Sequence, residues 1–221
     1  MQNTRGLLSR APWELSIPAS TNILIITESW LEGTEVPAIP GFPHSFGLGR
    51  RAAAVAGTAT RGGVAVYIRS LPGHSATVWR SRAADGVLWI QLNEPEPMCI
   101  AVCYLPPSHS GGCPRDVGQW FRNLADDITD AQALGRVLVA GDFNARTATL
   151  PDYEVVDEGP WLTSRLIDVH TGETSPLPLQ RLSTDRQLNS HGRHLLHLCK
   201  VTGLRLLNGR TPGDTPAVVV V

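Results

Sequence analysis

Short apolar runs, each bounded by glycine, proline or polar residues, constrain the fold of this chain more than any other feature. Runs of this length that are rich in β-branched side chains are typical of strands. The predicted strands are residues 23–27, 63–69, 87–92, 99–104 and 137–140. Those between residues 63 and 104 follow one another with only turns between them. This order predicts hairpins in a layered α/β sandwich and not a doubly wound parallel sheet.

Apolar side chains at helical spacing predict two helices, over residues 116–133 and 194–203. The second ends at a glycine suited to a helix C-cap and leads into a further strand predicted at 204–207. The segments 37–57 and 153–189 are rich in glycine, proline or polar residues. We therefore expect both to be long surface loops, where many enzymes grip their substrates.

Composition limits the class of protein. A length of 221 residues, 42% of them hydrophobic, predicts one folded domain over residues 1–221. The formal net charge of -1 leaves any contact with nucleic acid to local basic clusters. The four cysteines form no Cys-x-x-Cys pair and are expected to be reduced. No run suits a bilayer span or a signal peptide, so we expect an intracellular protein, nuclear or cytoplasmic, that binds no membrane.

The segment 137–146, Val-Leu-Val-Ala-Gly-Asp-Phe-Asn-Ala-Arg, carries the sharpest chemical signal. An apolar strand ends there in Asp142 and Asn144, which at a spacing of two are expected to point the same way, with Phe143 toward the core. In phosphodiester hydrolysis, Asp142 could orient and deprotonate an attacking water, and the Asn144 amide could donate to the charge that develops on phosphorus. An Asx turn at the strand end explains the same two residues equally well.

Together with other segments in the expected order, this segment resembles the signature of the endonuclease/exonuclease/phosphatase superfamily. Residues 3–7 (Asn-Thr-Arg-Gly-Leu) resemble the opening motif, and residues 25–31 (Ile-Ile-Thr-Glu-Ser-Trp-Leu) resemble the second. Residues 62–67 (Gly-Gly-Val-Ala-Val-Tyr) and 102–107 (Val-Cys-Tyr-Leu-Pro-Pro) resemble the third and fourth. The resemblance implies a four-layer α/β sandwich, in which helices flank two mainly antiparallel central sheets.

The resemblance also implies a divalent metal, Mg²⁺ with Mn²⁺ as the alternative. Glu28, at the end of an apolar strand, would hold it, and a single carboxylate suits a hard cation that keeps several waters. Asn3 could add a neutral oxygen nearby. The Tyr104 hydroxyl, at another strand end, could donate to a phosphate or fix a catalytic carboxylate. Without the resemblance, Glu28 is a surface residue and Tyr104 a half-buried strand tyrosine.

The later part of the chain resembles the endonuclease domains of non-LTR retrotransposons and related reverse-transcriptase reading frames. The likeness lies in residues 181–185, 189–193, 195–199 and 203–210. It implies that Asn208 borders the active site, and a turn residue before Gly209 is the alternative. The implied partner is DNA, and we expect a monomer that stands alone or forms part of a larger retroelement polyprotein.

Two further signals do not complete a site. His191, His194 and His197 have a three-residue spacing, but no cysteine or carboxylate completes a tetrahedral zinc set, and His191 is expected to precede the helix. Asp168 and His170 offer an acid/base pair, but this pair falls in a long loop and not at a strand end.

The sequence contains no Ser-Asp-His, the motif with which the superfamily ends. We therefore expect a chain that is incomplete at its C-terminus, lacks the closing strands and is weak or inactive, because a positioned general acid/base contributes about 10²–10⁴-fold in rate. A metal-dependent DNA endonuclease and a catalytically dead remnant or binding module both stay open. Within the enzyme class, a phosphatase acting on a small phosphorylated substrate is the alternative.

Overall fold

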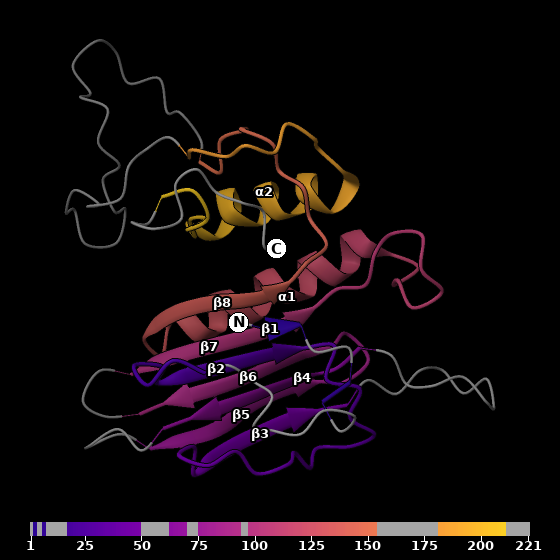
Figure 1. Ribbon diagram of the computed structural model, residues 1–221. Helices are drawn as coiled ribbons and strands as arrows, with labels where there is room; N and C mark the ends of the chain where they lie inside the picture. Colours follow the sequence, from indigo (N-terminus) through magenta and orange to yellow (C-terminus); the bar gives the residue numbers. More distant parts are fainter. Residues whose placement is uncertain are drawn as a thin grey trace. The chain divides into compact units, whose positions relative to one another are not determined.

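Two four-stranded β-sheets form the framework of the computed structural model (Figure 1). The structure describes residues 2–3, 6–7, 17–49, 62–69, 75–93, 97–153 and 181–210. The chain forms two compact units. The first comprises Met1–Asp116 and Asp126–Phe143 and contains both sheets, and the second comprises Val117–Ala125 and Asn144–Val221.

The first sheet has the strand order β1-β2-β4-β3. Its strands are β1 (Gln2–Asn3), β2 (Ile23–Thr27), β3 (His44–Leu48) and β4 (Val64–Ile68). Strand β1 runs parallel to β2, whereas β4 pairs antiparallel with both β2 and β3. Every residue of β4 is buried, as expected for a central strand whose two faces are both covered.

The second sheet has the strand order β5-β6-β7-β8. Its strands are β5 (Ala76–Arg82), β6 (Val87–Leu92), β7 (Met98–Tyr104) and β8 (Arg136–Asp142). The first three strands form antiparallel hairpins, and β8 pairs parallel with β7 after the crossover through helix α1 (Val117–Gln132). Each sheet is therefore mainly antiparallel, as predicted, and each also contains one parallel pair.

The two sheets pack face to face on aliphatic side chains. Alternate residues of β4, namely Val64, Val66 and Ile68, join Ile90 and Val102 of the second sheet in one buried cluster. The intervening residues of β4 face the other way and pack in a second cluster. This alternation is the period of a strand, and it places the main core between the sheets.

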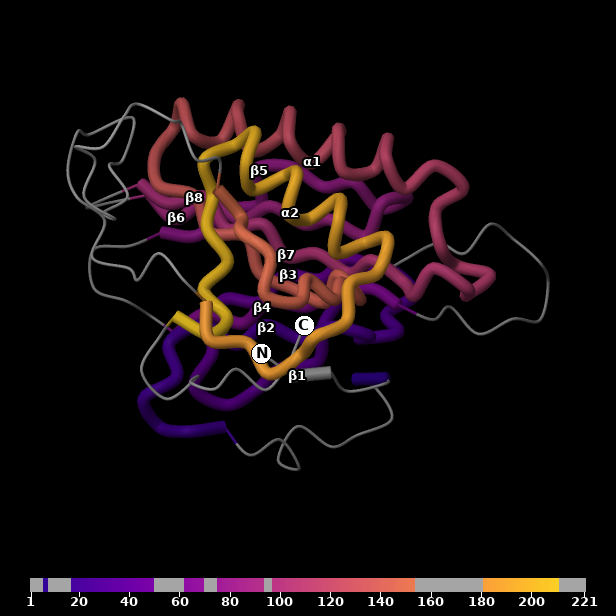
Figure 2. Tube along the Cα trace, turned by 90° about the horizontal axis from the view of Figure 1, so that it is seen from above, coloured from indigo at the N-terminus to yellow at the C-terminus, as the bar shows by residue number. Residues whose placement is uncertain are grey.

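The C-terminal part of α1 lies over the face of the second sheet that is turned away from the first (Figure 2). Its Asp127, whose side chain has no exposed surface, accepts hydrogen bonds from Arg80 and Arg82 of β5. The Arg82 Nε–Asp127 Oδ2 distance is 2.7 Å. The outer face of this sheet is thus held to the helix by a buried carboxylate between two arginines.

The second unit is built on helix α2 (Ser190–Thr202). The Asn189 side chain caps its N-terminus, and Gly203 ends it with φ 74°, as expected of a C-cap glycine. Within this unit the ring of Phe121, from the N-terminal part of α1, stacks on His194 of α2 with ring centroids 5.4 Å apart.

Most predicted elements are confirmed, as is the α/β sandwich with two central sheets. The strand predicted at 204–207 is wrong, because these residues form no strand. The helix predicted from residue 194 begins at Ser190, so His191 lies inside it and is buried, and its predicted place before the helix is wrong. The loop predicted at 37–57 contains β3, whose polar residues hid a strand that depends on pairing with β4.

The structure tests some of the remaining sequence predictions and leaves others untested. All four cysteines are free, as predicted. Among the described residues, no helix is long and apolar enough to cross a membrane. Asp168 and His170 lie outside the described residues. The prediction of a single domain over residues 1–221 stays a prediction.

Candidate active site

Glu28 lies directly after β2 in a backbone conformation that is rare for its residue type. Its φ is 53°, and Trp30, two residues later, has φ 54°. A non-glycine residue in the left-handed region costs on the order of 1–3 kcal/mol and persists only where the surrounding structure holds it. Such residues cluster at functional sites, so the turn at the end of β2 has the backbone signature of one.

Backbone hydrogen bonds on both sides hold this turn. The Gly6 N–H donates to the Glu28 carbonyl over 2.8 Å, which extends the parallel pairing of β1 with β2. On the other side, the Trp30 N–H donates to the Gly62 carbonyl over 2.8 Å. Gly62 and Gly63 have φ 106° and 80°, a conformation that glycine adopts without the strain of a side chain, so the segment can pair closely with the turn after β2.

Tyr104 brings the second sheet to the same place. It is the last residue of β7 and only 5% exposed, and its hydroxyl donates to Glu28 Oε1 over 3.1 Å. The Tyr104 hydroxyl was expected either to donate to a phosphate or to fix a carboxylate, and in the structure it contacts the Glu28 carboxylate. A buried ring and a charge-assisted hydrogen bond together restrict where the Glu28 side chain can lie.

Asp142 is the neighbour of Tyr104 in the sheet. It ends β8, is 8% exposed, and is the register partner of Tyr104 in the parallel pair. Its carbonyl accepts the Leu105 N–H over 2.8 Å. The ends of β2, β7 and β8 therefore bring together three predicted site residues that are far apart in the sequence.

Gly141 is what lets β8 approach β7 so closely before Asp142. Its φ is 147°, and a Cβ atom at this position would lie 2.0 Å from the Cys103 carbonyl oxygen. No side chain fits such a gap, so glycine is required here for steric and conformational reasons. The glycine of the Gly-Asp-Phe-Asn segment thus sets the position of the aspartate that follows it.

Asn3 is placed by its backbone alone. It pairs in register with Thr27, one residue before Glu28, so β1 runs beside the predicted metal ligand. Its side chain lies outside the described structure. The prediction that Asn3 adds an oxygen near Glu28 stays a prediction.

The donors at this edge suit a hard divalent cation. Glu28 and Asp142 offer carboxylate oxygens, and Mg²⁺ is commonly held by one or two carboxylates with several waters. The Thr27 and Ser29 hydroxyls, which flank Glu28, are buried and have no hydrogen-bond partner among the described residues. Buried hydroxyls usually have a hydrogen-bond partner, and a water or an ion is one kind of partner that could serve these two. Within the described ranges, however, no three His, Cys, Asp or Glu side chains form a ready metal cluster.

The remaining predicted residues, Asn144 and Asn208, belong to the second unit. Strand β8 ends at Asp142, and Asn144 has φ 47°, so the alternation of strand side chains does not extend to it. The expected parallel orientation of Asp142 and Asn144 therefore has no support from strand geometry. Asn208 is exposed in a turn between two residues that contact Asp152: Leu206 donates its N–H to that carboxylate, and Arg210 its guanidinium.

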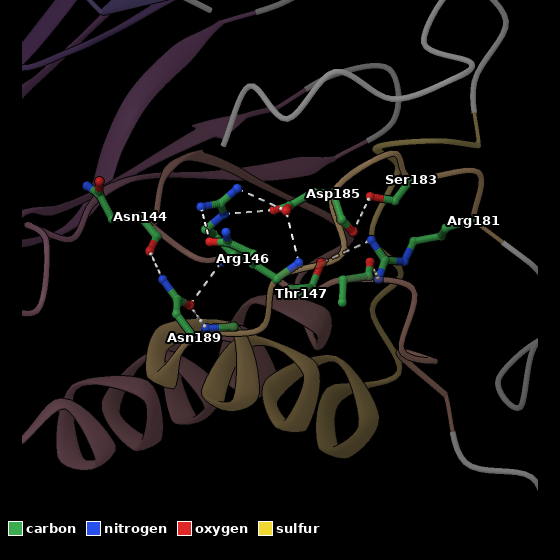
Figure 3. Close-up of polar contacts among 10 residues, drawn as sticks. Asn144, Arg146, Thr147, Arg181, Ser183, Asp185 and Asn189 are labelled. Atoms are coloured by element: carbon green, nitrogen blue, oxygen red, sulfur yellow. Dashed lines mark hydrogen bonds and ion pairs between the residues drawn. The ribbon is translucent and has the colours of Figure 1, made fainter.

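A polar network that the sequence did not predict begins at the Asn144 carbonyl and continues through Asn189, Arg146 and Asp185 (Figure 3). The Asn189 side chain donates to the Asn144 carbonyl, and the Arg146 guanidinium donates to Asp185. The hydrogen bonds from Arg146 hold the pKa of the Asp185 carboxyl below its usual value. Asparagine before a helix is a recognisable cap signal, but the helix start was expected four residues too late for Asn189 to qualify.

The sequence profile described as the Endonuclease/Exonuclease/phosphatase family matches residues 3–204. The match includes Glu28, Tyr104, Asp142 and Asn144, and it covers most of the chain. No curated protein matches the chain.

Proposed function

The chain belongs to the endonuclease/exonuclease/phosphatase family, whose members hydrolyse phosphoester bonds and generally depend on a divalent metal, and we propose that it is a Mg²⁺-dependent DNA endonuclease. The observation that supports the proposal most is the hydrogen bond from Tyr104 to Glu28, which links the ends of strands in two different sheets. The register of Tyr104 with Asp142 adds the predicted base to the same edge.

Glu28 is the residue that would hold the metal, with Mn²⁺ as the alternative ion. When bound, the ion supplies positive charge that polarises the phosphoryl oxygens of the substrate. Tyr104 fixes the Glu28 carboxylate through its hydroxyl, so the ligand is oriented before any ion arrives. In metal sites the ligands are typically oriented in this way, by hydrogen bonds from neighbouring residues that do not themselves bind the metal.

Asp142 and Asn144 carry the reaction in this proposal. The Asp142 carboxylate orients an attacking water and accepts its proton. The Asn144 carboxamide donates to the oxygens on which negative charge develops in the transition state. Asn208, exposed in the second unit, contacts a phosphate of the substrate.

DNA is proposed as the substrate because residues 181–210 resemble retroelement endonucleases. The net charge of -1 requires that phosphate contacts come from local basic residues. Arg186 and Arg193 of the second unit are exposed and suit that purpose. A phosphatase acting on a small substrate would use the same edge without these arginines.

The test is a nicking assay on supercoiled plasmid with Mg²⁺, run on this chain and on a version extended to the next in-frame stop codon. We expect Asp142→Asn to lower the rate by about 10²–10⁴-fold, because the general base is lost. Glu28→Gln removes the charged ligand, so it should lower the rate and raise the Mg²⁺ concentration needed for half-maximal nicking. Glu35→Gln, at an exposed glutamate in the same unit, is the matched control and should leave the rate unchanged.

Three results would contradict the proposal. Nicking that survives both Asp142→Asn and Glu28→Gln would place the activity elsewhere. Hydrolysis of p-nitrophenyl phosphate without nicking would favour the small-substrate phosphatase. DNA binding without hydrolysis by either version of the chain would favour a binding module.

A further inference from the structure

The Asn189 side chain contacts the backbone of three other residues. Its Nδ2 donates to the Asn144 carbonyl over 2.8 Å. Its Oδ1 accepts the Arg146 N–H over 2.9 Å and the Gly192 N–H over 2.8 Å. One carboxamide therefore caps helix α2 and also holds the loop on both sides of Ala145 (Figure 3).

Close packing supports these hydrogen bonds. The Asn189 N–H donates to the Arg146 carbonyl over 3.1 Å, so the two residues are joined in both directions. A Cβ atom at Gly192 would lie 1.9 Å from the same carbonyl oxygen, so the first turn of α2 rests directly on the loop. A side chain at position 192 would push the loop away, and the glycine of the Asn-Ser-His-Gly segment is explained by this contact.

The loop needs such support because of its backbone. Asn144 has φ 47°, in the left-handed region that non-glycine residues rarely adopt, although asparagine adopts it more readily than most. The conformation of one residue in a loop persists when its neighbours are fixed on both sides. The carbonyl of Asn144 and the amide of Arg146 are the two groups that the Asn189 side chain fixes.

We propose that Asn189 is a positioning residue of the active site, which holds Asn144 in this conformation and so directs its carboxamide. The inference rests on the proposed function, in which Asn144 donates to the substrate phosphate. The Asn189 carboxamide accepts two N–H groups at its oxygen and donates to a carbonyl from its nitrogen, so its two roles belong to different atoms. The substitution Asn189→Asp keeps the acceptor oxygens and removes the donor, so it separates the helix cap from the hold on Asn144.

The experiment compares Asn189→Asp, Asn189→Ala and the control Asn123→Asp. Asn123 lies on α1, where its side chain accepts a solvent-exposed hydrogen bond from Gln119, so the control makes the same chemical change away from the loop. Three measurements are made: thermal unfolding for the midpoint, NMR for the chemical shifts of Asn144 and Arg146, and nicking kinetics for kcat and KM.

For Asn189→Asp we expect a smaller fall in the thermal midpoint than for Asn189→Ala, because the acid still caps the helix although the bond to the Asn144 carbonyl is lost. The Asn144 and Arg146 resonances should shift, and kcat should fall about 10²-fold with little change in KM, because misplacing a reacting group by about 1 Å costs this much. Asn189→Ala should lower the thermal midpoint as well. If Asn189 acted only as a helix cap, its substitution would lower the thermal midpoint without lowering kcat at constant KM.

The outcomes distinguish this inference from the proposed function. Unchanged Asn144 resonances in Asn189→Asp would overturn the positioning role, whatever the activity. Shifted resonances with wild-type kcat would overturn it too, because the loop position would then be irrelevant to the rate. A wild-type chain that shows no hydrolysis in either length refutes the proposed function itself, and the resonances still report whether Asn189 holds the loop.

Discussion

Replacing Asp152 by asparagine is expected to destabilise the second unit by about 3–5 kcal/mol, because the Arg210 guanidinium would stay buried without its counter-charge. The two side chains are 0% and 1% exposed, and their N–O distances are 2.6 and 2.8 Å. The same carboxylate accepts the Leu206 N–H over 2.7 Å. Asp152 thus holds the turn that contains Asn208, the predicted phosphate contact.

A double variant tests whether the loss of stability comes from the charge that is left buried without a partner. Asp152→Leu with Arg210→Met removes both charges, and replacing a buried ion pair by apolar residues is often neutral. What remains is the Leu206 N–H, which loses its acceptor at a cost of about 1–3 kcal/mol. The single variants should each cost about 3–5 kcal/mol, so the double variant should be more stable than either of them.

Urea unfolding followed by far-UV circular dichroism measures these free energies, with unchanged m-values as the check that the transitions are comparable. The matched control is Asp130→Asn, at an ion pair whose aspartate is 57% exposed, which should cost less than about 1 kcal/mol. The reasoning is refuted if Asp152→Asn costs no more than Asp130→Asn, or if the costs of the two single substitutions simply add.

The pH dependence has a defined sign. Burial raises the pKa of the Asp152 carboxyl, but hydrogen bonds from Arg210 and from the Leu206 N–H outweigh this and hold it below its usual value. The ionised carboxylate therefore contributes stability above its unfolded pKa of about 3.9, and this contribution is lost as the pH falls through the lower folded pKa. The free energy of unfolding of Asp152→Asn should fall less steeply on acidification than that of the wild type.

Two further substitutions test the first unit. Tyr104→Phe keeps the buried ring and removes the hydrogen bond to Glu28, so Mn²⁺ affinity measured by electron paramagnetic resonance should fall about 10–100-fold. Unchanged affinity would show that Glu28 does not need this partner. Gly141→Ala places a Cβ atom against a carbonyl at φ 147° and should cost more than about 1 kcal/mol in urea unfolding. Gly111→Ala is its control, because no atom other than those of its chain neighbours lies within 4 Å of the added Cβ atom. An equal cost at both positions would contradict the steric argument.

Local pattern was enough to predict the central strands and both helices. Strands β2, β6 and β7 are nearly continuous apolar runs, because they are buried on both faces, and such runs are visible in any window of sequence. Strands β3 and β5 were missed for the opposite reason. Each carries polar residues and pairs with one neighbour only, so its conformation depends on a partner strand from elsewhere in the chain.

The start of α2 could not be predicted from the apolar spacing either. Asn189 caps the helix, but the apolar spacing becomes regular only several residues later. The expected start therefore fell too late, and His191 was placed outside a helix that buries it. Residues 204–207 are apolar enough for a strand, yet none of the described strands pairs with them, and they stay in an irregular segment.

The order of the motifs around Glu28, Tyr104 and Asp142 was enough to predict which residues carry the chemistry. The hydrogen bonds from Tyr104 to Glu28, 76 residues away, and from Asn189 to Asn144, 45 residues away, could not be predicted in this way. Residue type and spacing act locally, whereas a hydrogen bond between distant residues forms only once the strands and helices are packed. The sequence motifs identify the functional side chains, and the packing within each unit orients them.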